Sequence, residues 1–262
     1  MLSIMWQRLT NEKSRRLLWR LLAFLGALLV WQIAAWAVGQ DFLLSSPLNV
    51  LRRLFSLLGE ANSYLVFSVS LGRTMLGFAL GLAIGCLLAV PAARLPLVET
   101  ALFPYMVTVR SVPVASFIVL AYIWLSSAEL SVFISFLIVL PVIYNSLLGA
   151  LKARDRGLDE MAGVFHLPFF TRLRYIWIPQ VRAALLAACS TAVGLAWKSA
   201  VAAELIGLAD GTIGGELYNA KLYLDTPALF AWTLLIVLAS VATEKAILAV
   251  LRLALGERRG KI

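Results

Sequence analysis

Long apolar runs constrain the fold of this chain more than any other feature. A helix that crosses a bilayer needs roughly 20 mainly apolar residues, and the sequence contains about six runs of that length. Charged residues make up only 14% of the chain and hydrophobic residues 61%, so lipid is the expected surrounding of most of these runs. We therefore predict an all-α bundle of about six transmembrane spans, at Leu17–Val38, Leu65–Val90, Val98–Leu125, Leu130–Leu151, Ala183–Leu208 and Pro227–Leu251.

The distribution of basic residues predicts which side of the membrane each connection faces. Lysine and arginine are retained on the cytoplasmic side during insertion, and here they are concentrated before the first run, between the fourth and fifth runs, and after the last. We expect both termini in the cytoplasm, with a cytoplasmic segment 1–16, a cytoplasmic loop 152–182 and a cytoplasmic tail 252–262 in a single domain of residues 1–262. The net charge of +9 does not indicate nucleic-acid binding, because the basic residues form no single patch.

The residue content offers little material for catalysis. Cys86 and Cys189 both lie inside apolar runs, and His166 is the only histidine. A disulfide framework, a metal site and a histidine-based catalytic triad are therefore not expected. The chain also lacks the Gly-x-x-x-x-Gly-Lys-Ser/Thr pattern of a phosphate-binding loop. We expect no catalytic residue and no cofactor in this chain.

Several local patterns predict how the helices begin, pack and bend. Ser46 and Pro47 are typical of a helix start, and an apolar stripe follows them, so we expect a short helix on the outer membrane surface. Three glycines spaced by four residues predict a close approach between two helices: Gly77, Gly81 and Gly85. Three prolines are expected to kink the third and fourth spans: Pro104, Pro113 and Pro141. The glycine-containing segment 207–227 is expected to be an outer connector, with a gate or a partner contact as the alternative.

The segment between the fourth and fifth runs is too long for a turn and too amphipathic for a linker. Four apolar residues share one helical face: Leu158, Met161, Ala162 and Phe165. Asp159 and Glu160 stand near the helix start, where the helix dipole favours acidic groups. Pro168 is expected to end this helix, and Pro179 to begin the next span. Apolar residues exposed on a cytoplasmic hairpin need a surface that buries them, so the segment is interpreted as a docking element for another protein.

This docking element resembles the EAA loop of bacterial ATP-binding-cassette (ABC) importer permeases. The family pattern is Glu-Ala-Ala, three residues, Gly, nine residues, then Ile-x-Leu-Pro. Glu160, Ala162, Ile176 and Pro179 stand at the matching positions. The sequence departs from the pattern at His166, which replaces the glycine, and also at Met161 and Ile178. The glycine usually permits a turn with positive φ, and histidine tolerates that conformation better than most residues.

Other segments resemble the nitrate, taurine and aliphatic-sulfonate branch of these permeases: residues 110–115, Trp197-Lys198, residues 203–207, residues 225–227 and Phe230-Ala231. The resemblance implies a type I importer fold in the bacterial plasma membrane. Two copies, expected to be a homodimer, would form the pathway, with two ATPase subunits that bind ATP and Mg²⁺ and an extracytoplasmic substrate-binding protein. It also implies ATPase coupling by eight loop residues: Leu158, Asp159, Glu160, Met161, Ala162, Phe165, His166 and Pro168.

Three charged residues within or near the spans need an explanation, because a charge at the membrane centre costs about 2.5–3.5 kcal/mol on insertion scales. Arg110, Lys198 and Glu204 are candidates to line the translocation pathway, and the two cations would suit an anion. In the alternative, Glu204 pairs with a cation on another helix and the set only stabilises the bundle.

The substrate expected from the resemblance is a small anion such as a sulfonate, taurine or nitrate. A heterocyclic vitamin precursor remains an alternative. A stand-alone channel or secondary transporter is a further hypothesis, although the two halves show no clear repeat of the kind such transporters contain. The last hypothesis is a structural membrane scaffold with no transport role, and the amphipathic segment argues only weakly against it.

Overall fold

The structure is a computed structural model that describes residues 12–255. All regular secondary structure in that range is helical, which confirms the all-α class. The expected cytoplasmic segment 1–16 and tail 252–262 lie largely outside the described residues. The helices are α2 (Glu12–Val38), α3 (Pro47–Gly59), α4 (Ala61–Arg94), α5 (Pro96–Ser111), α6 (Val114–Ala121), α7 (Ser127–Lys152), α8 (Arg156–Val164), α9 (Phe169–Arg172), a π-helical segment (Leu173–Trp177), α10 (Ile178–Ile206), α11 (Ile213–Leu222) and α12 (Thr226–Ala254).

The predicted third span is broken into two helices. Among residues 12–255, five helices are long and apolar enough to cross a membrane, and α5 with α6 makes a sixth only if the two are counted together. These two helices meet at an angle of 100°. Pro113 has no N–H to donate and disfavours helical geometry at the residue before it, and Val112 accordingly has an extended ψ of 134°. The expectation of a merely kinked span is therefore wrong here, whereas Pro104 and Pro141 remain inside their helices.

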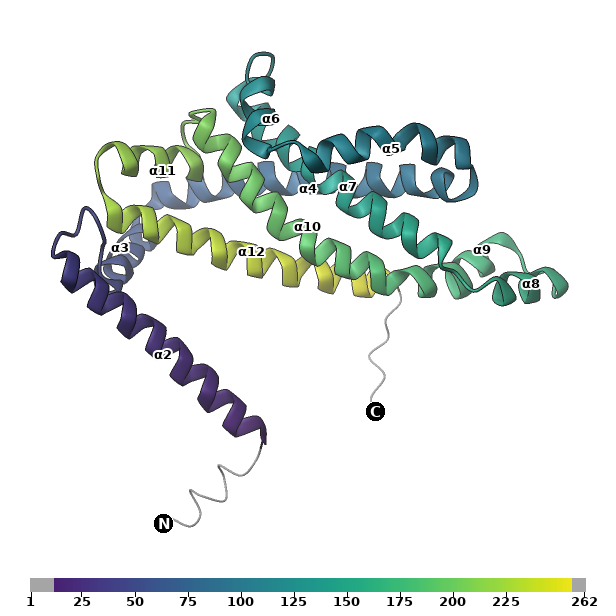
Figure 1. Ribbon diagram of the computed structural model, residues 1–262, viewed down its shortest axis with the longest axis horizontal. Helices are drawn as coiled ribbons and strands as arrows, with labels where there is room; N and C mark the ends of the chain where they lie inside the picture. The colour runs from purple at the N-terminus through teal and green to yellow at the C-terminus, as the bar shows by residue number, and fades with distance from the viewer. Residues whose placement is uncertain (1–11, 256–262) are drawn as a thin grey trace, which may run out of the picture. The chain divides into compact units, whose positions relative to one another are not determined.

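The chain divides into two compact units, and the larger one is built around α4, α7 and α10. It comprises the described residues of 61–218 and 234–255. Figure 1 shows α4 running alongside α7. A Cβ atom on Gly77 would lie 2.5 Å from the carbonyl oxygen of Val132, and one on Gly81 would lie 2.7 Å from Cβ of Val139. The predicted close approach at these glycines is therefore confirmed.

The smaller unit contains α2, α3 and residues 219–233. The hydroxyl of Ser46 accepts a hydrogen bond from the backbone N–H of Asn49, and Pro47 occupies the first turn, so the predicted start of α3 is confirmed. The indole N–H of Trp31 on α2 donates to the carbonyl of Ser45, which attaches the end of α2 to the turn before α3.

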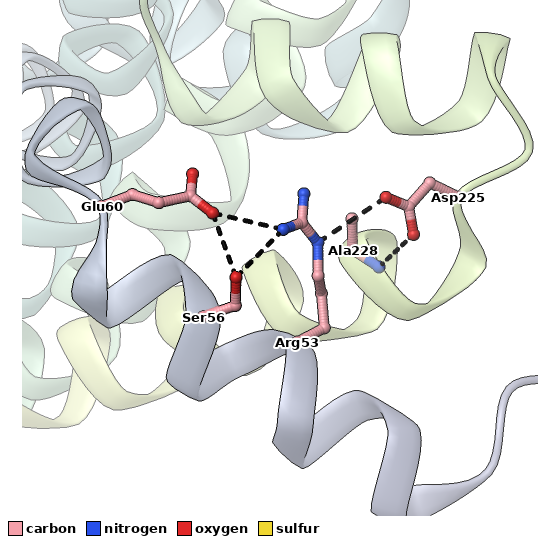
Figure 2. Close-up of polar contacts among 5 residues, drawn as sticks. All are labelled: Arg53, Ser56, Glu60, Asp225 and Ala228. Carbon is pink, nitrogen blue, oxygen red and sulfur yellow. Dashed lines mark hydrogen bonds and ion pairs between the residues drawn. The ribbon is translucent and has the colours of Figure 1, made fainter.

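Arg53 of α3 connects that helix to the start of α12 (Figure 2). Its guanidinium lies 3.3 Å from the carboxylate of Glu60 and 3.6 Å from that of Asp225. Asp225 also accepts a hydrogen bond from the backbone N–H of Ala228, as an N-cap does. The segment 225–227 that carries part of the family resemblance therefore has a structural role: it begins α12 and holds α3.

The fifth span begins earlier than the sequence predicts. One continuous run of helix extends over Phe169–Ile206, and Pro179 lies inside it. Because Pro179 cannot donate a hydrogen bond, the chain widens into the π-helical segment just before it, where Ile178 N–H bonds the carbonyl of Leu173. The second half of the 152–182 loop is therefore a helical extension of the span. Only α8 and its short connections form a separate element.

Candidate coupling site

Helix α8 lies at one end of α7 and α10, beside α9 (Figure 1). Two bonds to Asp159 attach it there. The indole N–H of Trp177 donates to Oδ1 at 2.7 Å, and Nη2 of Arg154 lies 3.5 Å from Oδ2. Asp159 is half-buried, so this predicted coupling residue faces the helices of its own chain. It links α8 directly to the π-helical segment that continues into α10.

Trp177 is the centre of this attachment. The guanidinium carbons of Arg94 and Arg154 lie 5.6 Å and 5.0 Å from the centre of its ring, within the range of cation–π attraction. Arg94 is the last residue of α4, and Arg154 follows α7. One tryptophan therefore joins the ends of three long helices to α8.

His166 ends α8 in a left-handed conformation, with φ of 49°. Its N–H bonds the carbonyl of Gly163, and the N–H of Leu167 bonds the carbonyl of Ala162. This pair of bonds is the Schellman motif, in which glycine usually occupies the left-handed position. Histidine thus forms the turn despite the departure from the family pattern. The helix ends at Val164, so Pro168 does not end it, contrary to the prediction, and instead precedes α9.

Arg172 fixes the turn from the other side. Its Nη2 donates to the carbonyl of Ala162 at 2.9 Å, and its Nε donates to the carbonyl of Leu167 at 2.8 Å. Ala162 belongs to the last turn of α8 and Leu167 follows the helix, so the guanidinium lies at the end of α8 where the helix dipole is negative. A cation on α9 therefore stabilises the orientation of α8 relative to the span.

The apolar residues of α8 point in two directions. Ala162 is fully buried, whereas Leu158, Met161 and Phe165 are exposed, Phe165 to 70%. The four residues predicted to share one face therefore differ in environment: Ala162 packs against the protein, and the other three are exposed to solvent. The exposed set is larger than predicted, because it also includes Val164, Phe169 and Phe170. Glu160, His166 and Pro168 are exposed as well.

The carboxylate of Glu204 is enclosed within the larger unit. The hydroxyl of Ser70 donates to Oε2 at 2.8 Å, the N–H of Gly214 donates to the same oxygen at 3.2 Å, and the hydroxyl of Ser131 lies 3.4 Å from Oε1. The hydrogen-bond donors to this carboxylate are thus two hydroxyls and an amide. The alternative in which Glu204 pairs with a cation on another helix stays a prediction.

The other two pathway candidates lie elsewhere. Lys198 is exposed on α10 although its immediate neighbours are buried. Arg110 is exposed at the end of α5 and lines a cavity of about 190 Å³ together with Glu99, Tyr144 and Asn145. Within residues 15–255, the structure does not bring Arg110, Lys198 and Glu204 into one site.

Sequence reasoning missed the residues that hold α8 in place: Arg94, Arg154, Arg172 and Trp177. A usable signal existed for Trp177, because a half-buried tryptophan usually finds a hydrogen-bond partner for its indole N–H. The position of Arg172 after a helix end offered a weaker one, since cations favour that end of the dipole.

The similarity of this chain to known proteins shows which class of membrane protein it belongs to. Residues 81–253, well over half of the chain, match the family described as binding-protein-dependent transport system inner membrane component. The chain belongs to this family. It is a multi-pass permease subunit of an ABC importer in the bacterial plasma membrane, and a permease component of this kind is not itself an enzyme.

Three relatives show the range of the group. The chain is 27% identical to the formylaminopyrimidine transport permease of Halalkalibacterium halodurans, over 84% of this chain and 88% of that protein. It is 24% identical to a putative aliphatic sulfonates transport permease of Bacillus subtilis, over 82% and 78%. It is 26% identical to the taurine transport permease of Escherichia coli, over 93% and 95%.

Proposed function

We propose that residues 1–262 form one permease domain with both termini in the cytoplasm, and that two copies form the translocation pathway. Each copy docks α8 onto one of two ATPase subunits, which bind ATP and Mg²⁺, and a binding protein delivers the substrate from outside. The family membership supports the presence of an ATPase and a binding protein in the system.

One observation carries the coupling proposal: α8 is attached rigidly to a span while its apolar side chains are exposed. Asp159 and Trp177 fasten α8 to the helix that continues into α10. Movement of an ATPase surface bound to Met161 and Phe165 would therefore shift the span rather than bend a loop. Coupling of this kind biases an equilibrium between inward-open and outward-open states.

Reversal of the charge at Glu160 tests the docking. Glu160 is exposed on α8, next to the residue that anchors the helix. We expect Glu160→Arg to abolish retention of the cognate ATPase during co-purification, while the chain still inserts into the membrane. The matched control is Asp210→Arg, the same charge reversal at the exposed turn beyond the other end of α10. Normal ATPase retention and normal substrate-stimulated hydrolysis in the Glu160 variant would contradict the proposal.

The proposed substrate is a small anion such as taurine, an alkanesulfonate or nitrate. Exposed cations on α5 and α10 support it, and so does the cavity at Arg110. Asn145 and Tyr144 also line that cavity, as does the acidic Glu99, and the hydroxyl of Tyr144 has no hydrogen-bond partner among the described residues. A formylaminopyrimidine-like heterocycle is the second candidate, favoured by the similarity to a permease named for that transport.

Lys198→Met tests the pathway role of the lysine. A lysine within a span costs about 2.5–3.5 kcal/mol on insertion scales, so replacing it with methionine is not expected to harm insertion. We expect the rate of anion uptake in proteoliposomes to fall by about tenfold, equivalent to about 1.4 kcal/mol in the transport barrier, while the assembled complex forms normally. Lys221→Met, at an exposed position of α11, is the control. Unchanged uptake by an assembled Lys198 variant would show that the lysine has no transport role.

A further inference from the structure

The cavity at Arg110 lies between α5 and α7, and a buried hydroxyl without a partner lines it. Tyr144 is only 2% exposed, and its hydroxyl forms no hydrogen bond with any described residue. Buried polar groups without a partner are rare in folded proteins and need an explanation. Beside it, the amide nitrogen of Asn145 donates to the carbonyl of Pro141 at 2.7 Å and has a second hydrogen to donate. A ligand in the cavity would supply the acceptor that both groups lack.

The charges that line the cavity favour an anion at one end. Only two charged residues line it, Glu99 and Arg110, and they stand about three helical turns apart on α5. The carboxylate of Glu99 is bonded to Lys152 at 2.5 Å, which offsets its negative charge. Within residues 15–255, the guanidinium of Arg110 has no carboxylate partner. The positive charge at the Arg110 end of the cavity is therefore the one that lacks a counterion in the described chain.

The remaining wall of the cavity is apolar, with Phe103, Met106 and Val107 from α5 and Leu148 from α7. An inorganic oxyanion such as nitrate would contact the polar groups and leave this wall in contact with water. An anion with an alkyl group covers both parts, as ligands do in small-molecule sites that combine apolar walls with a few polar groups. The volume of about 190 Å³ restricts the ligand to a small one, since drug-sized ligands occupy roughly 300–1,000 Å³.

We propose that this cavity is a substrate subsite of the permease itself and that it binds an organic anion with a short alkyl group. The anionic group lies at Arg110, the hydroxyl of Tyr144 donates to one of its oxygens, and the alkyl group packs against Met106 and Leu148. The choice of an anion as the substrate rests on the proposed function. The permease would then distinguish anions by their organic part, in addition to any selection by the binding protein.

Binding by the unmodified full-length chain in lipid nanodiscs tests the selectivity without any variant. The probe is ethanesulfonate, and its binding is followed by NMR as saturation transfer from the protein to its methyl protons, with empty nanodiscs as the control. Nitrate is the competitor. We expect ethanesulfonate to bind and nitrate to displace it only at a concentration at least about tenfold higher, because nitrate lacks the two buried carbons. No saturation transfer above that of empty nanodiscs, or displacement by an equal concentration of nitrate, would overturn the proposal.

Tyr144→Phe tests the specific role of the hydroxyl. The variant keeps the buried ring and removes only a group that has no partner in the chain, so the fold is expected to persist. We expect ethanesulfonate to bind about tenfold or more weakly, as the loss of a hydrogen bond to a charged group implies. The matched control is Tyr105→Phe, the same change at an exposed position of α5 outside the cavity. Unchanged affinity in the Tyr144 variant, or an equal loss in the control, would show that this hydroxyl does not contact the ligand.

These binding measurements contain neither an ATPase nor a binding protein, so they are independent of the docking test at Glu160. Uptake of ethanesulfonate by the assembled importer is measured separately. Normal binding without uptake would contradict the proposed substrate and leave the subsite in place. Uptake without binding by the permease would contradict the subsite and leave the proposed function in place.

Discussion

Arg172→Ala is expected to uncouple ATP hydrolysis from transport without removing any residue that touches the ATPase. The guanidinium bonds the carbonyls of Ala162 and Leu167 at the end of α8. A hydrogen bond that involves a charged group contributes about 1.5–3 kcal/mol. The free energy lost with both bonds is therefore larger than the stability that a nine-residue helix has from its own helix propensity. We expect α8 to remain attached at Asp159 but to lose its fixed orientation.

The measurement is substrate-stimulated ATP hydrolysis and uptake by the assembled importer in proteoliposomes. We expect stimulation to fall by at least about tenfold, which corresponds to a loss of about 1.4 kcal/mol of coupling free energy. Basal hydrolysis by the ATPase subunits should persist. Affinity for the ATPase should fall less than stimulation does, because Met161 and Phe165 are still present.

Arg174→Ala is the matched control, because it removes the same side chain two positions further along the same helical run. Arg174 is exposed. If both variants lose stimulation equally, the effect comes from the positive charge of the loop and the geometric role of Arg172 is wrong. If neither does, the two carbonyl bonds are unimportant for coupling.

Features of the fold that depend on local sequence were predictable. Ser46 and Pro47 begin α3 because a cap depends on only a few neighbouring residues. The glycine spacing at Gly77 and Gly81 predicted a close helix contact, although it did not identify α7 as the partner. The break at Val112 was missed because hydropathy averaged over a long window reports composition and carries no information on direction.

The sequence motif of the candidate site was predictable, but the contacts that hold its helix in place were not. Glu160 and Ala162 identified α8 as the helix for which coupling is proposed. The attachment of that helix depends on Trp177, which is 18 positions away from its partner Asp159. The environment of Glu204 depends on Ser70, which is 134 positions away in sequence. Contacts of that kind follow from the packing of helices, which no local pattern specifies.

The packing around Glu204 leads to the second large expected effect: Glu204→Leu should prevent stable folding of the larger unit. Leucine is similar in size but accepts no hydrogen bond. The substitution would leave the hydroxyls of Ser70 and Ser131 and the N–H of Gly214 without an acceptor in a buried region. Each buried group left unsatisfied costs about 1–3 kcal/mol, and the sum is comparable to the total stability of a typical domain, about 5–15 kcal/mol.

Glu204→Gln is the discriminating control. Its amide oxygen can accept from Ser70 and Gly214, and its NH₂ group can donate to the hydroxyl of Ser131, so the network is kept while the charge is removed. Thermal unfolding in detergent and the monodisperse fraction on size exclusion report folding, and uptake reports function. We expect the leucine variant to aggregate and the glutamine variant to fold and transport nearly normally. A glutamine variant that folds but does not transport would instead place the carboxylate charge in the translocation pathway, because the only property it lacks is that charge.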